Sequence, residues 1–401
     1  MDLAELTALL TPEGLRLVDE LGPLDSTDDV AAAVSRLRAA GLAPDLVSAA
    51  VGQARLRTRA RAKFGPFADR MLFTRAGLEQ ATRLEIGARH AGRFRDAGVT
   101  RVADLGSGIG GDSLAFAGIG LDVLAVDADE ITAAIAAYNL APFGATVRHT
   151  RAEEVDLDGI DAVWLDPARR TAGHTETTRV GADAWTPSLD WVFGLAERMP
   201  AGIKLGPAFD RSLLPAGSDS HPVEAQWISV DGSTIELVVW TGPLARPGVR
   251  RSALVVRGVS AAELTASGDA DDAAVRDLGA YVHEPEGAVI RARLIGEVAR
   301  GLNAGMLDPK IAYLTSDAAA TGEFAPFVQS FRVRESLPND VKALGRALRE
   351  RGIGTLEIKK RGVDVDPATL RTRLKLRGDA SATLIITRVG AARLTLLTDR
   401  V

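Results

Sequence analysis

A glycine-rich turn between an apolar segment and a helix start most constrains how this chain can fold. Residues 102–105 predict a short buried strand, and residues 106–111 predict a tight turn. A helix is expected to begin at Asp112. Glycine adopts positive φ readily and lets a ligand approach the backbone, while a helix N-terminus favours an anionic group. The segment therefore predicts a strand–turn–helix unit of an open α/β sheet, with a ligand site at the turn.

The glycines alone do not identify the ligand, because Gly106, Gly108 and Gly111 also fit the dinucleotide pattern G-x-G-x-x-G. Asp104 would repel a diphosphate but suits a ligand that carries an ammonium group beside its carboxylate. Asp127 ends a second apolar strand 21 residues after Gly106, near the spacing expected of an acid that holds ribose hydroxyls. The two acids favour a zwitterionic ligand such as S-adenosylmethionine, although each alone could be an ordinary strand-end residue.

With these features the chain resembles the class I S-adenosylmethionine-dependent methyltransferases, and residues 161–170 strengthen the resemblance. They predict a fourth strand with Asp166 and Pro167 at its carboxyl end, where open α/β sheets bind ligands. Amine-methylating members carry Asp/Asn-Pro-Pro-aromatic there, whereas this chain has Ala168 and Arg169 in the last two places. The resemblance implies that Asp166 and the Pro167 carbonyl orient an acceptor amine. Arg169 would stack on a base or pair with a phosphate; otherwise the motif is only a strand-ending turn.

The resemblance also implies a cofactor site. One acid would bind the ammonium group, the turn would bind the carboxylate, a second acid would bind the ribose, and the loop after the third strand would meet the adenine. The residues expected in these roles are Asp104, Gly106, Ser107, Gly108, Gly110, Asp127, Ala128, Ala152 and Glu153.

Alternating strand and helix patterns from residue 99 to 243 predict a doubly wound Rossmann-like sheet that is complete by Pro247. Segments 224–230 and 234–240 flank Asp231-Gly232 and predict an antiparallel hairpin. An antiparallel last strand is typical of the methyltransferase sheet, whereas dinucleotide folds end parallel. Lys204, on the fifth strand, is interpreted as either structural or phosphate-facing.

The chain is expected to divide into four parts. Residues 1–95 form a helical N-terminal region, with one helix over 75–94 that carries His90 on its surface or at a cap, or else towards the cofactor pocket. Residues 96–245 form the methyltransferase domain, and residues 246–329 a small ferredoxin-like α+β module. Residues 330–401 form a basic domain similar to THUMP RNA-binding domains. This layout resembles a bacterial subgroup of the methyltransferases.

RNA is the expected partner, because residues 331–378 hold 13 Lys or Arg against 6 Asp or Glu in a chain of net charge −5. A purely solvated surface is the alternative, both here and for the arginine-rich segment 55–63. The loop 170–187 after the fourth strand is expected to contact substrate, with Trp185 stacking on a base or anchoring the loop. The residues expected to contact RNA are Arg170, Trp185, Lys359, Lys360 and Arg361.

Composition excludes several other classes. The chain has no cysteine, and its five histidines lack H-x-x-x-H spacing, so neither disulfides nor a metal site is expected. No basic segment precedes an apolar one at the N-terminus, and no apolar run approaches the roughly 18 residues that span a bilayer. A cytoplasmic protein without a membrane partner is expected.

The sequence therefore predicts an S-adenosylmethionine-dependent methyltransferase that modifies a base in structured RNA, either tRNA or rRNA. Two alternatives stay open. One is a nicotinamide-dependent oxidoreductase on a Rossmann sheet, although the chain lacks a Tyr-x-x-x-Lys pattern. The other is a non-catalytic RNA-binding protein with a degenerate methyltransferase core.

Overall fold

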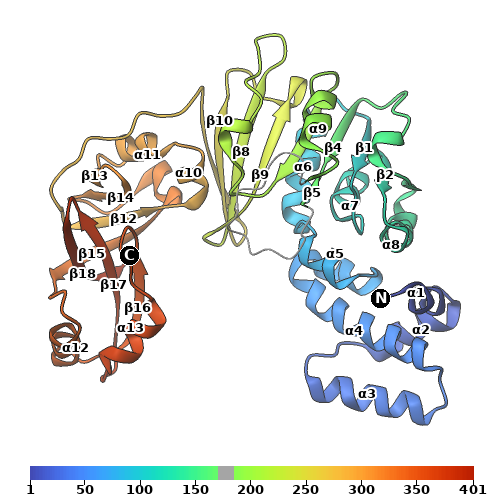
Figure 1. Cartoon of the computed structure of the whole chain (residues 1–401), viewed down its shortest axis with the longest axis horizontal. Coiled ribbons are helices and arrows are strands. Elements are labelled where there is room, and N and C mark those ends of the chain that lie inside the picture. Colours follow the sequence, from blue (N-terminus) through green and yellow to red (C-terminus); the bar gives the residue numbers. More distant parts are fainter. Residues whose placement is uncertain (170–184) are drawn as a thin grey trace. The chain divides into compact units, whose positions relative to one another are not determined.

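The computed structural model describes residues 1–169 and 185–401, which form two compact units (Figure 1). It has the mixed α/β architecture predicted from the sequence, with a helical N-terminal region, a large sheet rich in parallel strands, and a second sheet towards the C-terminus. The first unit comprises residues 1–205, 215–223 and 239–245, and the second comprises 206–214, 224–238 and 246–401.

The N-terminal region is helical because capping residues start its helices and apolar residues on the helix faces pack together. Ser26 and Asp29 form a reciprocal capping box at the start of α3, and Pro44 occupies the first turn of α4. Leu37 and Val51 pack in the core between these two helices. The helices here are α1 (Leu3–Leu9), α2 (Pro12–Leu21), α3 (Thr27–Ala39), α4 (Pro44–Phe64), the 3-10 helix η1 (Gly65–Arg70), α5 (Arg75–Gln80) and α6 (Leu84–Asp96).

The single helix expected over residues 75–94 is wrong, because α5 and α6 are separated at residues 81–83. The Lys63 ammonium donates to the carbonyls of Leu78, Glu79 and Ala81 at 2.7–2.8 Å and so caps the end of α5. The Thr82 hydroxyl donates to Asp112 at 2.7 Å. Polar contacts from other parts of the chain therefore stabilise the break.

The large sheet contains nine strands in the order β11-β10-β8-β9-β7-β4-β1-β2-β3. Strands β3, β2, β1, β4 and β7 pair in parallel. The strands are β1 (Arg101–Leu105), β2 (Asp122–Asp127), β3 (Thr146–His149), β4 (Ala162–Leu165), β7 (Ala201–Leu205), β8 (Val223–Val230), β9 (Ser233–Thr241), β10 (Arg251–Arg257) and β11 (Ser260–Ala266). The connecting helices are α7 (Gly111–Gly118), α8 (Glu130–Leu140) and α9 (Leu189–Ala196).

The predicted hairpin is confirmed, since β8 and β9 are adjacent and only Asp231 and Gly232 separate them. Both turn residues have positive φ, 49° and 81°, as the tightest hairpin turns require. Ala201, at the start of β7, donates its N–H to the hydroxyl of Thr241, at the end of β9. Strand β9 therefore runs antiparallel to β7 as well, which is the arrangement expected of a methyltransferase sheet.

The expectation that this sheet is complete by Pro247 is wrong. Strand β10 pairs in parallel with β8, and β11 pairs antiparallel with β10, so both extend the same sheet. Every residue of β8 is buried, as are five of the seven residues of β10. A buried strand such as β8 needs a neighbour for its backbone groups, and β10 provides it.

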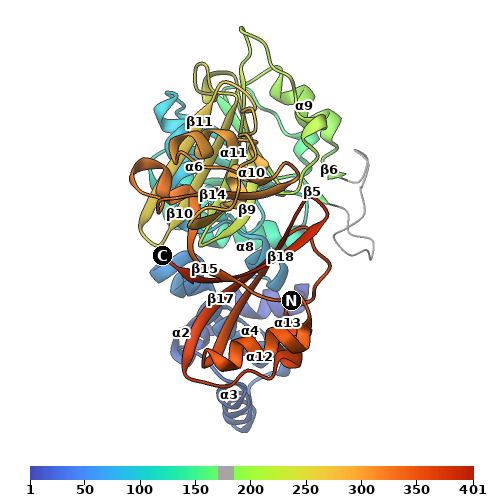
Figure 2. The ribbon, with the colours of Figure 1, turned by 90° about the vertical axis from the view of Figure 1, so that its left-hand side faces the viewer.

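The second sheet contains seven strands in the order β13-β14-β12-β15-β18-β17-β16. All seven strands come from residues 281–400. The helices α12 and α13 pack against each other and against β16 (Figure 2). Its elements are β12 (Tyr281–Pro285), α10 (Gly287–Arg291), α11 (Ile295–Gly301), β13 (Gly305–Asp308), β14 (Ile311–Ser316), β15 (Val328–Ser336), α12 (Val341–Glu350), β16 (Ile353–Lys360), α13 (Pro367–Leu374), β17 (Ala380–Val389) and β18 (Ala392–Arg400).

Candidate active site

The turn after β1 has the geometry that its glycines predict. Gly106, Gly108 and Gly110 have φ of 96°, 55° and 88°, a region that residues with a Cβ rarely adopt. A Cβ at Gly106 would lie 3.0 Å from the carbonyl oxygen of Asp166, whereas one at Gly108 would meet nothing within 4 Å. The turn is therefore packed tightly against the end of β4 at one glycine and open at another, so a ligand can approach its backbone.

Asp104 and Ser107 provide buried polar atoms beside this turn. The Asp104 side chain is 1% exposed, and its Oδ2 accepts a hydrogen bond from Ser113 at 2.6 Å. Among the described residues, Asp104 Oδ1 and the Ser107 hydroxyl have no hydrogen-bond partner. Burial, together with the nearby Asp112 carboxylate, raises the pKa of Asp104 to about 8. An unsatisfied buried acid is costly, so these residues fit a ligand that brings a cation.

Asp127 braces the same turn from the end of β2. One carboxylate oxygen accepts the N–H of Gly108 and the other accepts the N–H of Asp129, both at 2.9 Å. Burial raises the pKa of Asp127. The carbonyl oxygen of the next residue, Ala128, lies 3.2 Å from Nε2 of His149. The expected contact of Asp127 and Ala128 with a ribose stays a prediction.

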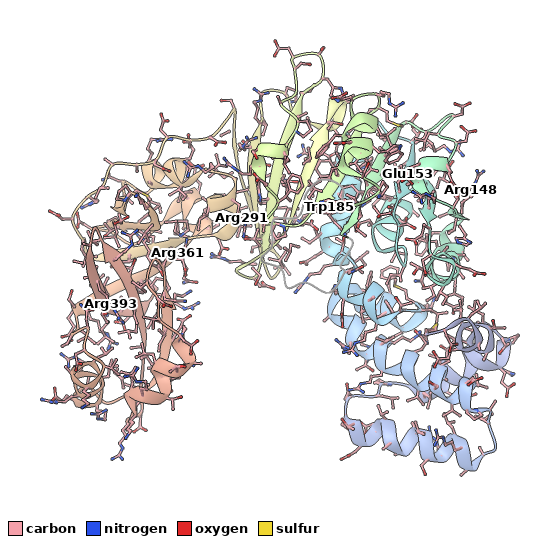
Figure 3. The ribbon with its side chains drawn as sticks, in the orientation of Figure 1. Arg148, Glu153, Trp185, Arg291, Arg361 and Arg393 are labelled. Atoms are coloured by element: carbon pink, nitrogen blue, oxygen red, sulfur yellow. The ribbon has the colours of Figure 1, made fainter. Side chains whose placement is uncertain are left out.

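Ala152 and Glu153 form a short 3-10 helix after β3. Ala152 is buried, and Glu153, whose side chain is labelled in Figure 3, accepts a hydrogen bond from Arg151 at 3.0 Å. Both line a cavity of about 370 Å³ together with Trp191, Leu195 and other residues, none of which belongs to the glycine turn. Their expected contact with the adenine stays a prediction.

Asp166 lies where the resemblance expects an acceptor-binding acid, but it already has a cationic neighbour. The Lys204 ammonium, from the end of β7, is 2.6 Å from Asp166 Oδ2. It also lies 3.1 Å from the Thr82 hydroxyl and 3.8 Å from Asp112 Oδ2. The sequence left Lys204 as either structural or phosphate-facing. In the structure its ammonium instead binds a carboxylate at the centre of the site.

Asp112 and His90 complete this group; the sequence assigned Asp112 no role beyond the helix start and named the cofactor pocket as the second of two places for His90. Asp112 is buried and lies 3.0 Å from His90 Nδ1. Burial alone would raise the pKa of Asp112, but Lys204, His90 and Thr82 outweigh it and lower the pKa to about 2. His90 is 1% exposed against Trp164, so its expected place on the helix surface is wrong.

The remaining predicted residues after β4 are only partly described. Pro167 is buried, and the backbone of Arg169 pairs with that of Trp185 in the two-stranded ladder β5 (Ala168–Arg169) and β6 (Trp185–Thr186). Trp185 is 5% exposed (Figure 3), so burial supports its anchoring role. Arg170 and the rest of the expected substrate loop, through residue 184, lie outside the described residues.

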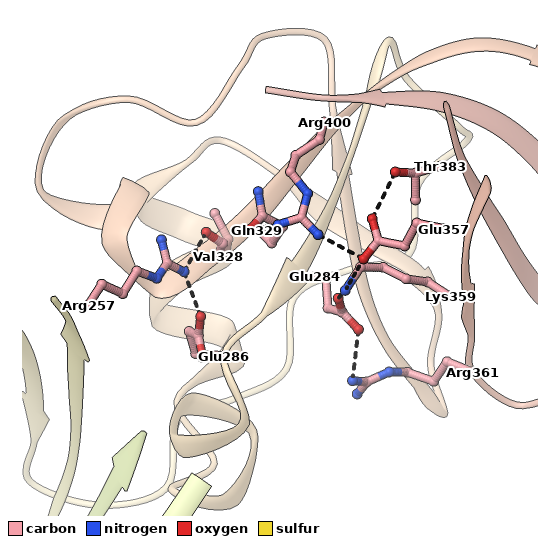
Figure 4. A network of polar contacts seen from close by, with 10 residues as sticks. All are labelled: Arg257, Glu284, Glu286, Val328, Gln329, Glu357, Lys359, Arg361, Thr383 and Arg400. Atoms are coloured by element: carbon pink, nitrogen blue, oxygen red, sulfur yellow. Dashed lines mark hydrogen bonds and ion pairs between the residues drawn. The ribbon is translucent and has the colours of Figure 1, made fainter. Parts of the chain in front are cut away.

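The basic residues predicted on β16 form ion pairs within the second unit. Lys359 Nζ lies 2.6 Å from Glu284, and Arg361 lies 3.6 Å from the same carboxylate (Figure 4). Lys360 points to the other side of the strand and is exposed. Two of the three expected RNA-contacting side chains therefore stabilise the sheet.

The arginine-rich segment on α4 is also partly structural. Arg57 is buried and pairs with Asp19 at 2.6 Å, and Lys63 caps α5. Arg55, Arg59 and Arg61 are exposed, and Arg61 pairs with Asp69. The segment thus has an exposed face, which is compatible with both of its interpretations.

Two proteins of Mycobacterium tuberculosis, from strains CDC 1551 and H37Rv, are similar to the chain over most of its length. Each is named as an uncharacterized S-adenosylmethionine-dependent methyltransferase and is 33% identical over 349 residues, which cover 86% of this chain and 93% of the relative. The chain belongs to the S-adenosylmethionine-dependent methyltransferases. Its cofactor is therefore S-adenosylmethionine, which decides against the nicotinamide alternative.

Two domain families and a solved structure also match the chain. The THUMP domain-like family matches residues 328–400, and a domain family of unknown function matches residues 2–60. The crystal structure of a "putative methyltransferase" from Porphyromonas gingivalis W83 covers 94% of this chain and 99% of its own, at 20% identity and a TM-score of 0.67. That likeness supports the fold. No helix in the described part of the chain is long and apolar enough to cross a membrane.

Proposed function

We propose that this methyltransferase transfers a methyl group from S-adenosylmethionine to a nucleotide of structured RNA, such as tRNA or rRNA. The observation that carries the cofactor site is the buried Asp104 carboxylate, whose Oδ1 has no partner among the described residues. It lies next to a turn of three positive-φ glycines at the start of α7. Asp104 and the turn together suit the amino acid group of the cofactor. The Asp104 carboxylate would bind its ammonium, and the N–H groups of the turn would bind its carboxylate.

The residues of the chain would act mainly by positioning. Asp104, the turn and Asp127 would hold the cofactor, which supplies a methyl group activated by its sulfonium centre. Asp166, beside Gly106, would hold the acceptor on the open side of the turn. Because methyl transfer needs in-line approach of the nucleophile, correct placement supplies much of the rate enhancement.

The THUMP domain-like match and the charges of α12 and α13 support RNA as the substrate. The cationic side chains exposed on or next to these helices are Lys342, Arg346, Arg349, Arg351, Arg371, Arg373, Lys375 and Arg377. Hydrogen bonds from Thr369 lower the pKa of Asp366, the N-cap of α13, and the nearby charge of Lys360 adds to this effect. We therefore assign the phosphate contacts to Lys360 and this helical face, with Lys359 and Arg361 as supports beneath.

The test uses total RNA from cells that lack this protein, because such RNA keeps the target unmethylated. Purified protein and methyl-labelled S-adenosylmethionine should transfer label to one RNA size class, which gel separation identifies. The charge-removing variant Lys342→Ala/Arg346→Ala should weaken RNA binding, and the loss should shrink at high salt. Glu350→Ala, at the end of the same helix, is the control.

The non-catalytic alternative predicts a different outcome of the same assay. An RNA-binding protein with a degenerate core would retain RNA with the salt dependence expected of phosphate contacts but would transfer no label to any RNA class.

A cytoplasmic location, where tRNA and rRNA are plentiful, is part of the proposal.

A further inference from the structure

The Lys204–Asp166 pair lies where the proposed function needs its methyl acceptor. Strands β4 and β7 are parallel neighbours, so their carboxyl ends meet at one edge of the sheet. Asp166 follows β4, Lys204 is the fourth residue of β7, and their side chains are 35% and 12% exposed. The Asp166 carbonyl also packs against Gly106. A carboxylate and an ammonium 2.6 Å apart therefore lie together beside the cofactor turn.

Surrounding residues hold the lysine in this position. Thr82 lies 3.1 Å from Lys204 Nζ and donates its hydroxyl hydrogen to Asp112 at 2.7 Å. Asp112 lies 3.8 Å from the same ammonium and is itself held by His90. Lys204 is thus placed between two carboxylates, an environment that favours its charged form.

A second ammonium, that of Lys63, lies near Lys204. Burial lowers the pKa of Lys63, and the nearby charge of Lys204 lowers it further. The Lys63 Nζ is bound by three carbonyl oxygens around the end of α5. Lys204 therefore has a second cation near it as well as the carboxylates of Asp112 and Asp166.

These charges bear on the chemical class of the acceptor. Methyl transfer to a neutral amine places positive charge on the nitrogen, and a fixed ammonium nearby opposes that change. A hydroxyl oxygen instead gains negative charge as it loses its proton, and the same ammonium stabilises it. The arrangement at Asp166 thus favours an oxygen acceptor over the amine expected from the sequence.

We propose that the Lys204–Asp166 pair binds a hydroxyl acceptor, which in RNA is the ribose 2′-hydroxyl. This inference rests on the proposed function. The oxygen–methyl bond forms while the sulfur–methyl bond breaks, and the bonding electron pair stays on sulfur, which becomes a neutral thioether. The hydroxyl proton passes to the Asp166 carboxylate and then to solvent, while Lys204 offsets the negative charge on oxygen.

Alkaline hydrolysis of the labelled RNA distinguishes the two acceptors. The free 2′-hydroxyl is the nucleophile that cleaves RNA in alkali, so a 2′-O-methyl group leaves a resistant dinucleotide. We expect the label from the full-length protein in dinucleotides. Label in mononucleotides would overturn the hydroxyl inference and leave RNA methylation intact. No label in any RNA, with cofactor binding retained, would instead overturn the proposed function and the inference with it.

Variants of Lys204 test its part. Lys204→Met should lower kcat at least 100-fold while the affinity for S-adenosylhomocysteine, measured by calorimetry, changes less than threefold. Lys204→Arg keeps the charge and should restore part of kcat, a rescue that a purely structural role of the lysine amine would not produce. Lys310→Met, an exposed lysine in the second unit, is the matched control.

Thermal unfolding and circular dichroism decide whether a Lys204→Met sample is folded. If that variant is unfolded, the rate and pH profile of Lys204→Arg carry the test, because the higher pKa of guanidinium should shift any rate limb set by the lysine. Unchanged kcat in a folded Lys204→Met, or a folded Lys204→Arg with no more activity than Lys204→Met, would contradict the role given to the ammonium.

Discussion

The group around the glycine turn and the group around Glu284 both bring acids and bases together, but they satisfy their charges differently. Glu284 lies between Lys359 and Arg361, with its side chain 21% exposed, so each charge has an opposite neighbour and access to water. Near the turn, Asp104, Asp112 and Asp166 influence one another electrostatically, and Asp104 keeps an oxygen without a partner among the described residues. The first arrangement stabilises a sheet, whereas the second is suited to receive a ligand.

The largest effect on stability should come from Asp112→Asn, because it removes a buried charge that faces Lys204 and His90. Breaking a buried pair by removing one partner costs about 3 kcal/mol. Urea unfolding followed by tryptophan fluorescence should show the loss, since Trp164, Trp185, Trp191 and Trp240 all belong to the first unit. Asp96→Asn, which is exposed, is the control. Equal midpoints for the two variants would mean that the buried carboxylate carries no net stabilisation.

The next effect concerns the turn backbone and should follow from Gly106→Ala. A Cβ there needs positive φ and lies 3.0 Å from the Asp166 carbonyl, so strain and displacement together should cost about 1–3 kcal/mol. We expect at least a tenfold loss of affinity for S-adenosylhomocysteine by calorimetry. Gly120→Ala has a similar φ of 91° with nothing within 4 Å and should lose stability only. Equal affinities in the two variants would show that the close approach at Gly106 does not shape the ligand site.

A smaller effect per pH unit should appear in the stability that Asp104 contributes. Its folded-state pKa, about 8, exceeds the ordinary value of 3.8, so the folded protein binds the extra proton between these values. Stability from this group is complete below about pH 4 and is lost as the pH rises through 8, with a slope of at most about 1.4 kcal/mol per pH unit. Asp104→Asn should remove that part of the slope in urea titrations.

Ligand binding should reverse the Asp104 shift, because a cation favours the charged carboxylate. Calorimetry of S-adenosylhomocysteine in buffers of different ionisation enthalpy should then detect proton release near pH 7. The Asp104→Asn variant should release less. Identical proton release in both proteins would assign it to another group.

The strand–turn–helix unit could be predicted from the sequence because its determinants are local. Positive-φ glycines, an apolar strand and the acid at its end occupy consecutive positions, and Asp231-Gly232 similarly specifies the hairpin. The contacts of Lys204 could not be predicted this way. They join residues 82, 112, 166 and 204, which tertiary packing alone brings together. The only local sign was a lysine within the otherwise apolar segment 201–205.

Net charge likewise failed to locate the accessible cations of the C-terminal region. Residues 331–378 do contain more basic than acidic residues. Which of these basic side chains are free of an ion pair depends, however, on where the acidic side chains lie in the fold. Glu284 is 75 residues from Lys359 in sequence, and Asp399 is 65 from Arg334. Asp399 and Arg334 lie on the neighbouring strands β18 and β15, whereas three strands separate β12, which holds Glu284, from β16, which holds Lys359. Tertiary structure, which the sequence did not reveal, determines these pairs.

The smallest effect on stability should come from Glu284→Gln. This variant removes an acid of the second unit, as the variants of Asp104 and Asp112 do in the first. The ion pairs with Lys359 and Arg361 are partly exposed, so their loss should cost no more than about 1 kcal/mol. Hydrogen exchange should show faster opening of β12 and β16, with the first unit unchanged. The variant also frees two cations, so RNA affinity at low salt should stay equal or rise slightly, whereas Lys342→Ala/Arg346→Ala should lower it. A marked fall in RNA affinity for Glu284→Gln would instead mean that Lys359 and Arg361 contact RNA. It would show that RNA binding requires the orientation in which Glu284 holds them.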